Sequence, residues 1–179
     1  ASDTFTVALD TATAGTKIGQ ISFSNDDANE NPFNFSITGT VGVLNPEITV
    51  LGNGVSITDG DATPSAADHT SFGTVFQGQV AARTFTVRND GDGTLTLGAV
   101  VVPAGFTLTE GLSASLAPGA SDTFTVRMDT ATTGTKTGQI SFSNDDGDES
   151  PLTFAIGGTV QSYIVDDGDA GHPLVGTWG

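Results

Sequence analysis

The sequence predicts an all-β protein built from antiparallel β-sandwich modules in tandem. Short segments alternate apolar and polar residues with a period of two, which is the pattern of a strand with one buried face. Turn residues recur about every eight to twelve residues, and no segment has helical periodicity. The first 41 residues also recur at residues 120–160, each 119 positions later and without a gap, and about three quarters of the pairs are identical. A repeat about one domain long indicates tandem modules.

The repeat sets the expected domain boundaries. Residues 1–43 are expected to be the C-terminal half of a preceding repeat, and residues 44–161 a complete repeat. Residues 162–179 are expected to be a linker and the first strand of a different β domain, because the sequence after Val160 no longer follows the first copy. Pro46 favours an extended connection between the first two units.

Three strands are expected in the first half-repeat, at Thr4–Leu9, Gly19–Ser24 and Phe33–Val41. Their inward positions carry Phe, Val, Leu and Ile, and the segments between them are rich in turn residues. Three strands from the middle of a sandwich leave one face of the core open. Either further residues of a longer protein or another chain must therefore cover this face.

The complete repeat is expected to contain a series of short strands. They are Ile48–Leu51, Val55–Ile57, Phe72–Phe76, Ala82–Asn89, Leu95–Val102, Phe106–Thr109, Ser113–Leu116, Asp122–Met128, Thr137–Ser143 and Leu152–Val160. This series without a helix indicates immunoglobulin-like topology. The side chains expected in the core are Phe85, Val87, Leu95, Leu97, Phe106, Leu116, Phe124, Val126, Ile140, Phe142, Phe154 and Ile156.

Composition excludes several classes of partner. The chain has 21 acidic and 5 basic residues, a formal net charge of −16, so it lacks the basic face that nucleic acids and anionic membrane surfaces require. No apolar run approaches the length of a membrane span, so membrane insertion is not expected. There is no cysteine, which excludes disulfides and thiolate chemistry.

Acidic residues gather in the turns. The turns Asn89–Gly93 and Asn144–Ser150 are expected at the same end of the sandwich, where carboxylates that converge repel one another unless they are protonated or bind a cation. Calcium prefers such oxygen ligands. The candidate ligands are Asp90, Asp92, Asp145, Asp146 and Asp148. The alternative is that these are turn formers that keep the protein soluble. The stretch Asp59–Asp68 is a second candidate.

Catalytic motifs are not evident, and we expect a protein that is not an enzyme. The two histidines, His69 and His172, lie in different units, and no Gly-x-Ser-x-Gly motif is present. Trp178 is a candidate platform for sugar stacking, but a single tryptophan in a β domain is more often a core residue.

Several motifs together resemble a known family of repeats. They are Asn45–Ile48, Gly52–Gly54, Asp59–Asp61, Phe72–Val75, Arg83–Asn89, Gly91–Leu97, Pro103–Phe106 and Asn144–Pro151. Residues 44–160 resemble the immunoglobulin-like repeats of the choice-of-anchor D kind, related to the ASPM/SPD-2/Hydin family. The resemblance implies a large secreted or surface-anchored bacterial protein, and hence an extracellular or cell-surface location. The tail Tyr163–Gly179 resembles the start of a golvesin-type, carbohydrate-binding-like domain, which implies polysaccharide as a partner.

Three functions are open at this stage. The first is a non-catalytic structural or adhesive spacer in an extracellular surface or filament protein, whose partners are neighbouring modules of the same or identical chains. The second is an accessory module of a secreted polysaccharide-active enzyme. The third is a filament subunit that assembles by strand complementation through residues 1–43.

Overall fold

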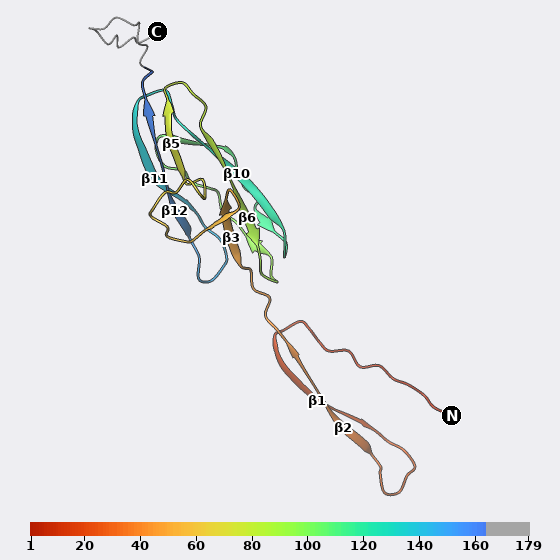
Figure 1. Ribbon diagram of the computed structural model, residues 1–179. Coiled ribbons are helices and arrows are strands. Elements are labelled where there is room, and N and C mark those ends of the chain that lie inside the picture. Colours follow the sequence, from red (N-terminus) through yellow and green to blue (C-terminus); the bar gives the residue numbers. More distant parts are fainter. Residues whose placement is uncertain (164–179) are drawn as a thin grey trace, which may run out of the picture. The chain divides into compact units, whose positions relative to one another are not determined.

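The computed structural model describes residues 1–163 and divides the chain into two compact units (Figure 1). Unit 1 is Ala1–Leu44 and unit 2 begins at Asn45. Every regular element within residues 1–163 is a β-strand, so the predicted all-β class is confirmed. Across these residues no helix is long and apolar enough to span a bilayer. The expected strand within Tyr163–Gly179 falls almost wholly outside the described residues.

Unit 2 is a sandwich of short strands. These are β3 (Ile48–Gly52), β4 (Val55–Ile57), β5 (Ser71–Phe76), β6 (Ala82–Asn89), β7 (Leu95–Thr96), β8 (Phe106–Glu110), β9 (Ser115–Leu116), β10 (Ser121–Met128), β11 (Gly134–Phe142) and β12 (Leu152–Gln161). One sheet has the order β4-β3-β6-β10-β8, and another has the order β11-β12-β5. All pairs are antiparallel except β12 with β5, which is parallel. A small pair, β7-β9, completes the unit.

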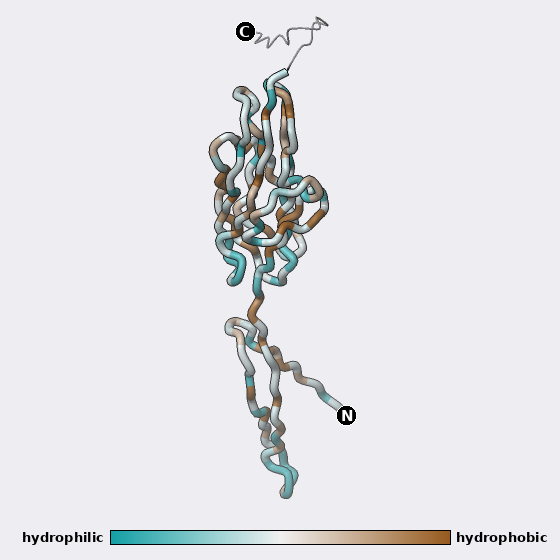
Figure 2. The backbone as a smooth tube through the Cα atoms, turned by 60° about the vertical axis from the view of Figure 1, so that its left-hand side comes forward, coloured by the Kyte–Doolittle hydropathy of each residue, from teal (hydrophilic) through white to brown (hydrophobic). Residues whose placement is uncertain are grey.

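The core lies between the two main sheets. The Phe85 ring stacks on Phe124 of the same sheet at 5.2 Å between centroids and contacts Phe154 of the opposite sheet at 5.3 Å. Phe124 also meets Phe142 edge-on at 6.0 Å. All twelve side chains that alternation placed in the core are buried, so that prediction is confirmed. Figure 2 shows hydrophobic stretches alternating with hydrophilic ones along the chain of this unit.

The expected strand Leu95–Val102 is wrong as a single element. Only Leu95 and Thr96 form a strand, paired with β9. From Gly98 onward the backbone bonds to β11 instead: the Gly98 N–H donates to the Ser143 carbonyl at 2.8 Å, and the Val101 N–H donates to the Ser141 carbonyl at 2.8 Å. The apolar run therefore changes partners midway. Period-two reasoning cannot detect such a change, because the apolar run does not show to which strand each half bonds. The second half is also less buried, and Val101 is 62% exposed.

Unit 1 contains a single hairpin, β1 (Gly15–Phe23) and β2 (Phe33–Val41). Its register repeats that of β11 and β12, pair for pair at the 119-residue offset, from Gly15 opposite Val41 to Phe23 opposite Phe33. The two hairpins thus form the same local structure.

The predicted strand at Thr4–Leu9 is absent. Its equivalent in unit 2, β10, is a strand because β6 and β8 bond to its two edges. Thr4–Leu9 runs extended over the hairpin instead, with the Phe5 ring 6.4 Å from Phe23 and 6.5 Å from Phe35. The sequence supplies the right side chains, but strand formation requires partner strands.

The two copies permit a matched test of the core. Phe142 is 2% exposed, whereas its equivalent in unit 1, Phe23, is 46% exposed. We expect Phe142→Ala to lower the unfolding free energy of unit 2 by about 3–5 kcal/mol, because it leaves a cavity in a closed core. We expect Phe23→Ala to have a far smaller effect on unit 1. Urea unfolding of both variants, followed by residue-resolved hydrogen exchange, measures each unit. Equal losses in the two units would contradict the difference in packing.

Candidate functional site

One end of unit 2 is organised by a buried asparagine at the end of β6. Asn89 is fully buried, and its side chain makes four hydrogen bonds. Its amide Nδ2 donates to the carbonyls of Gly93 (2.7 Å) and Leu116 (3.0 Å). Its Oδ1 accepts from the N–H groups of Glu47 (3.3 Å) and Gly91 (3.1 Å). A buried polar side chain satisfied in this way fixes the turn Asn89–Gly93 against the chain that leads into β3.

Backbone bonds strengthen the same attachment. The Asn45 carbonyl accepts from the N–H groups of Asp92 (3.0 Å) and Gly93 (2.9 Å), and the Glu47 carbonyl accepts from Asp90 N–H at 2.7 Å. The Asp92 carboxylate in turn accepts from Asn45 N–H at 2.8 Å. The segment Asn45–Glu47 therefore lies along this turn as an integral part of unit 2.

The five candidate calcium ligands lie in the two turns at this end, but most of them bind protein donors. Asp90 pairs with the Arg88 guanidinium and accepts from Thr49 Oγ1 at 2.7 Å. The hydrogen bonds from Arg88 and Thr49, together with the Arg88 charge, lower the pKa of Asp90. Asp145 accepts from the Thr96 N–H at 2.7 Å, and this bond lowers the pKa of its carboxyl. Such carboxylates act as turn and strand caps.

Asp146 belongs to a different grouping. Oxygens of Glu47, Asp146 and Glu149 lie within 4.8 Å of one another, the one such group of three found in residues 1–163. Asp146 is only 4% exposed, and its Oδ2 accepts from Ile48 N–H at 2.8 Å. Asp148 contributes to the electrostatics of this group through its charge near Glu149.

Glu149 is the electrostatically unfavourable member of the group. Its Oε2 is buried and accepts no hydrogen bond from the protein. Burial, and then the negative charges of Asp146, Glu47, Asp148 and Asp59, raise the pKa of the Glu149 carboxyl. Three oxygens at this spacing suit a divalent cation of the calcium type. Sequence reasoning missed Glu47 and Glu149 as ligands. Both residues are acidic and lie beside predicted turns, and these two features of the sequence could have identified them as candidate ligands.

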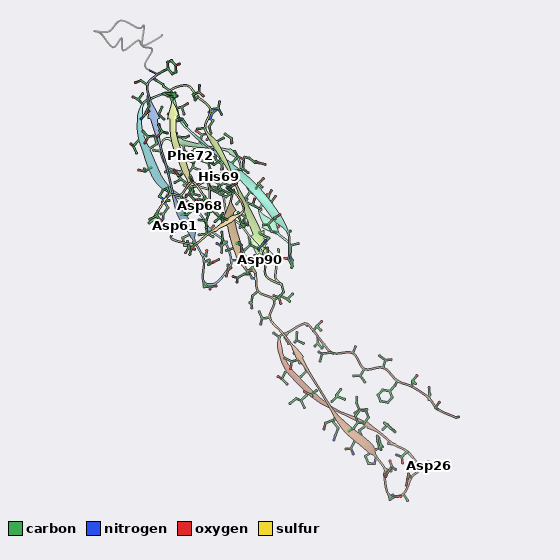
Figure 3. The ribbon with its side chains drawn as sticks, viewed as in Figure 1. Asp26, Asp61, Asp68, His69, Phe72 and Asp90 are labelled. Atoms are coloured by element: carbon green, nitrogen blue, oxygen red, sulfur yellow. The ribbon has the colours of Figure 1, made fainter. Side chains whose placement is uncertain are left out.

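The second candidate stretch, Asp59–Asp68, consists of carboxylates that cap the backbone (Figure 3). Asp68 is buried and accepts from Thr70 N–H and Oγ1, at 3.0 and 2.6 Å. Asp61 accepts from Thr63 N–H at 2.9 Å, and this bond lowers its pKa. Asp59 accepts from Thr153 N–H at 2.7 Å. The bonds of Asp68 and Asp61 to the N–H two residues further on are those of Asx turns, whereas the Asp59 bond joins this loop to β12.

His69 lies in the same loop, in the left-handed region with φ 65°. The remaining candidates, His172 and Trp178, lie outside the described residues.

A two-sheet β-sandwich with these strand pairings defines an immunoglobulin-like domain. Comparison with protein families refines the class: the family described as "HYDIN/CFA65/VesB-like, Ig-like domain" matches residues 65–159. The chain belongs to this family. The finer resemblances to choice-of-anchor D repeats and to a golvesin-type domain stay predictions.

Several solved structures are similar to this chain at low sequence identity. A protein of unknown function from Porphyromonas gingivalis W83 is 12% identical, with a TM-score of 0.49 over 84% of this chain and 68% of that chain. The PapD-like domain 7 of human CEP192 is 11% identical, with a TM-score of 0.46 over 65% of this chain and 86% of that chain. The VesB protease of Vibrio cholerae is 16% identical, with a TM-score of 0.39 over 65% of this chain and 31% of that chain. No curated protein matched the sequence.

The raised pKa of Glu149 gives stability a pH dependence of known sign. Below the unfolded-state pKa the carboxyl is neutral in both states and costs nothing. As the pH rises through the higher folded-state pKa, ionisation is resisted only in the folded state, so stability is lost. We expect Glu149→Gln, in the presence of a chelator, to raise the melting temperature of unit 2 at pH 7 by on the order of 2 °C, and to have no such effect near pH 4.

The matched control is Glu30→Gln, the equivalent position in unit 1. It is expected to leave the unit 2 transition unchanged. A Glu149→Gln variant that is destabilised at pH 7 would show that the carboxylate is stabilising in the folded state.

Calcium binding stays a prediction, and the geometry identifies the residues that test it. We expect millimolar calcium to raise the melting temperature of unit 2, because it would neutralise the repulsion among Glu47, Asp146 and Glu149. Glu149→Gln should abolish this increase, whereas Asp90→Asn should retain it. Calorimetry with and without a chelator measures both effects. An unchanged melting temperature in calcium would mean that the group does not bind calcium.

Proposed function

We propose that the chain is a non-catalytic structural spacer in an extracellular protein, where repeats are joined end to end. The observation that carries the proposal is that the chain enters and leaves unit 2 at opposite ends (Figure 1). Ile48, the first residue of β3, bonds to Asp146 in the turn that precedes β12. From that turn β12 runs ten residues, about 30 Å, before it ends at Gln161.

Opposite termini are what an end-to-end array requires. If both termini lay at one end, successive modules would project sideways from a common point. With this arrangement each added module extends the array by about its own length. The bonds from Asn89 and from the turn Asn89–Gly93 also fix the incoming segment Asn45–Glu47 to the module, which shortens the part of the connection that is free to bend.

Charge and family support the extracellular part of the proposal. The net charge of −16 keeps neighbouring chains apart in solution, which suits a long array of repeats. The resemblance of residues 44–160 to repeats of secreted and surface-anchored bacterial proteins points to the same location. Membership of a family whose description includes VesB is compatible with a supporting module in a larger secreted protein.

Array length tests the proposal directly. A variant in which residues 42–161 are duplicated in tandem adds one complete repeat with its own junction. We expect its maximum dimension in small-angle X-ray scattering to exceed that of the parent chain by at least about 30 Å, the length of β12. A tandem variant in which the extra repeat folds back, with little gain in length and a smaller ratio of maximum dimension to mass, would overturn the spacer proposal.

A further inference from the structure

Unit 1 exposes the side chains that form the core of unit 2. Phe5, Phe23 and Phe35 are 61%, 46% and 39% exposed. Their equivalents 119 residues later, Phe124, Phe142 and Phe154, are 0–2% exposed. The same holds for the aliphatic positions: Val7 and Leu9 are about half exposed, whereas Val126 and Met128 are buried. A contiguous apolar face of this kind on a soluble protein marks an interaction surface.

Unit 2 reveals what covers this face when it is closed. The strands between Asn45 and Leu116 extend both sheets around these side chains, and Phe85 of β6 packs on Phe124 of its own sheet and on Phe154 of the opposite sheet. The same strands also bond to the edges: β6 and β8 pair with β10, and β5 pairs in parallel with Gly157–Gln161 of β12. The equivalent edges in unit 1, Thr4–Leu9 and Thr38–Gly42, carry no such strand within residues 1–163.

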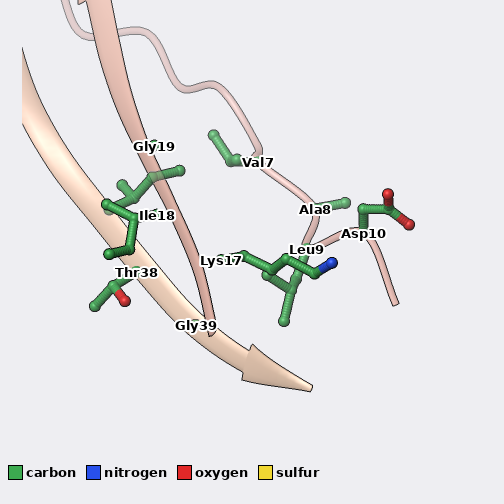
Figure 4. Close-up of a pocket in the computed structure, with 10 residues that line it drawn as sticks. Val7, Ala8, Leu9, Asp10, Lys17, Ile18, Gly19, Thr38 and Gly39 are labelled. Carbon is green, nitrogen blue, oxygen red and sulfur yellow. The ribbon is translucent and has the colours of Figure 1, made fainter. Parts of the chain in front are cut away.

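An apolar groove lies on the face of unit 1 (Figure 4). It has a volume of about 440 Å³ and is lined by Val7, Leu9, Gly19, Ile37 and Gly39, among others. In unit 2 a Cβ added to Gly138, the equivalent of Gly19, would collide with Pro103, and one added to Gly158, the equivalent of Gly39, would lie 2.8 Å from Phe72 Cβ and from Met128 Sδ. In unit 1 Leu9, the equivalent of Met128, already lies 3.0 Å from a Cβ added to Gly39, so the Phe72 contact is the one without a counterpart there. The groove is therefore the place where the counterparts of Pro103 and Phe72 sit in a closed module.

The glycine at position 19 independently supports the conclusion that another segment occupies this groove. Gly138 has to be glycine because the Pro103 ring rests directly on its backbone. In unit 1 the atoms nearest to a Cβ added at Gly19 are those of Ile37, at 3.6 and 3.9 Å, which is ordinary contact. Unit 1 alone thus has room for a side chain at this position. The glycine fits a partner that approaches as closely as Pro103 does in unit 2.

We infer that the apolar face of unit 1 binds the first half of a repeat of this same family, a segment with the strand pattern of Asn45–Gly119. Such a segment adds strands beside Thr4–Leu9 and Thr38–Gly42 and places a Phe72-like and a Pro103-like residue in the groove. In a second copy of this chain the equivalent segment already covers its own β10–β12. If unit 1 of one chain packed face to face with unit 1 of a second chain, the phenylalanines would be buried. Neither unit would then supply a strand to Thr4–Leu9 or to Thr38–Gly42 of the other. The inference stands independently of the spacer proposal.

The test uses a variant in which residues 45–119 are duplicated ahead of Ala1. Because the repeat has no gap, the new junction Gly119–Ala1 reproduces the native junction Gly119–Ala120. We expect the added segment and unit 1 to form one cooperative unit with a melting temperature near that of unit 2. We also expect the amides of Thr4–Leu9 and Thr38–Gly42 to become protected from hydrogen exchange, and binding of the dye ANS to fall several-fold relative to the parent chain.

Two results would overturn the inference. One is an added segment that stays unfolded while the amides of Thr4–Leu9 still exchange freely. The other is a parent chain that sediments as a dimer with those amides already protected, because the occupant would then be a second copy.

A pair of substitutions tests the docking geometry separately from folding. Gly19→Val should leave the hairpin of the parent chain intact, since it has room there. In the extended variant it should lower the melting temperature of the new unit by many degrees, because the side chain meets the added Pro103. Thr16→Val, at an exposed position of the same strand that does not line the groove, is the matched control and should change neither protein appreciably. An extended variant that tolerates Gly19→Val would overturn the proposed approach of the partner.

Discussion

The closure of one apolar face determines how much structure this sequence forms. The inward faces of β10 in one sheet and of β11 and β12 in the other are buried because β6, β8 and β5 extend the two sheets beside them and close the core. Within residues 1–163 the first copy of the sequence carries nearly the same side chains without those neighbouring strands, and its regular structure is the hairpin alone. Burial of Phe124 and strand formation in β10 thus both result from the neighbouring strands that pair with β10. In the equivalent segment Thr4–Leu9, Phe5 is exposed and no strand forms.

The hairpins show which part of the structure is local. Both have the same nine-pair register, and in both an asparagine side chain closes the turn: Asn25 Nδ2 donates to the Glu30 carbonyl and Asn144 Nδ2 to the Glu149 carbonyl, each at 2.9 Å. These contacts lie within six residues along the chain, so they form without the rest of the module. Local hydrogen bonds set the register of each hairpin. The strands that pack around the hairpin decide whether its apolar face is exposed to solvent or buried.

Sequence reasoning succeeded where the outcome depended on pattern and failed where it depended on a partner. Period-two alternation identified Phe85, Phe142 and Phe154 as core residues, because a strand with one buried face has no other way to place them. It could not foresee that the run after Leu97 transfers to β11, nor that Thr4–Leu9 lacks partners. For the acidic end, it located the turns correctly but not the grouping. Which carboxylates face each other depends on which of them already accept from protein donors. Only the folded turns reveal that Asp90 accepts from Thr49 Oγ1 and Asp145 from the Thr96 N–H.

The placement of β3 and β12 has a consequence for a protein that is pulled. Tension between the two ends of unit 2 acts along β3 in one direction and along β12 in the other. Ladder hydrogen bonds lie roughly perpendicular to the strands, so this load shears many of them at once instead of opening them one after another. β3 is held by β4 and β6, and β12 lies between β11 and β5, so each strand must slip past two neighbours before it can leave its sheet. The strand order that buries the phenylalanines therefore also makes unit 2 resistant to stretching along its long axis.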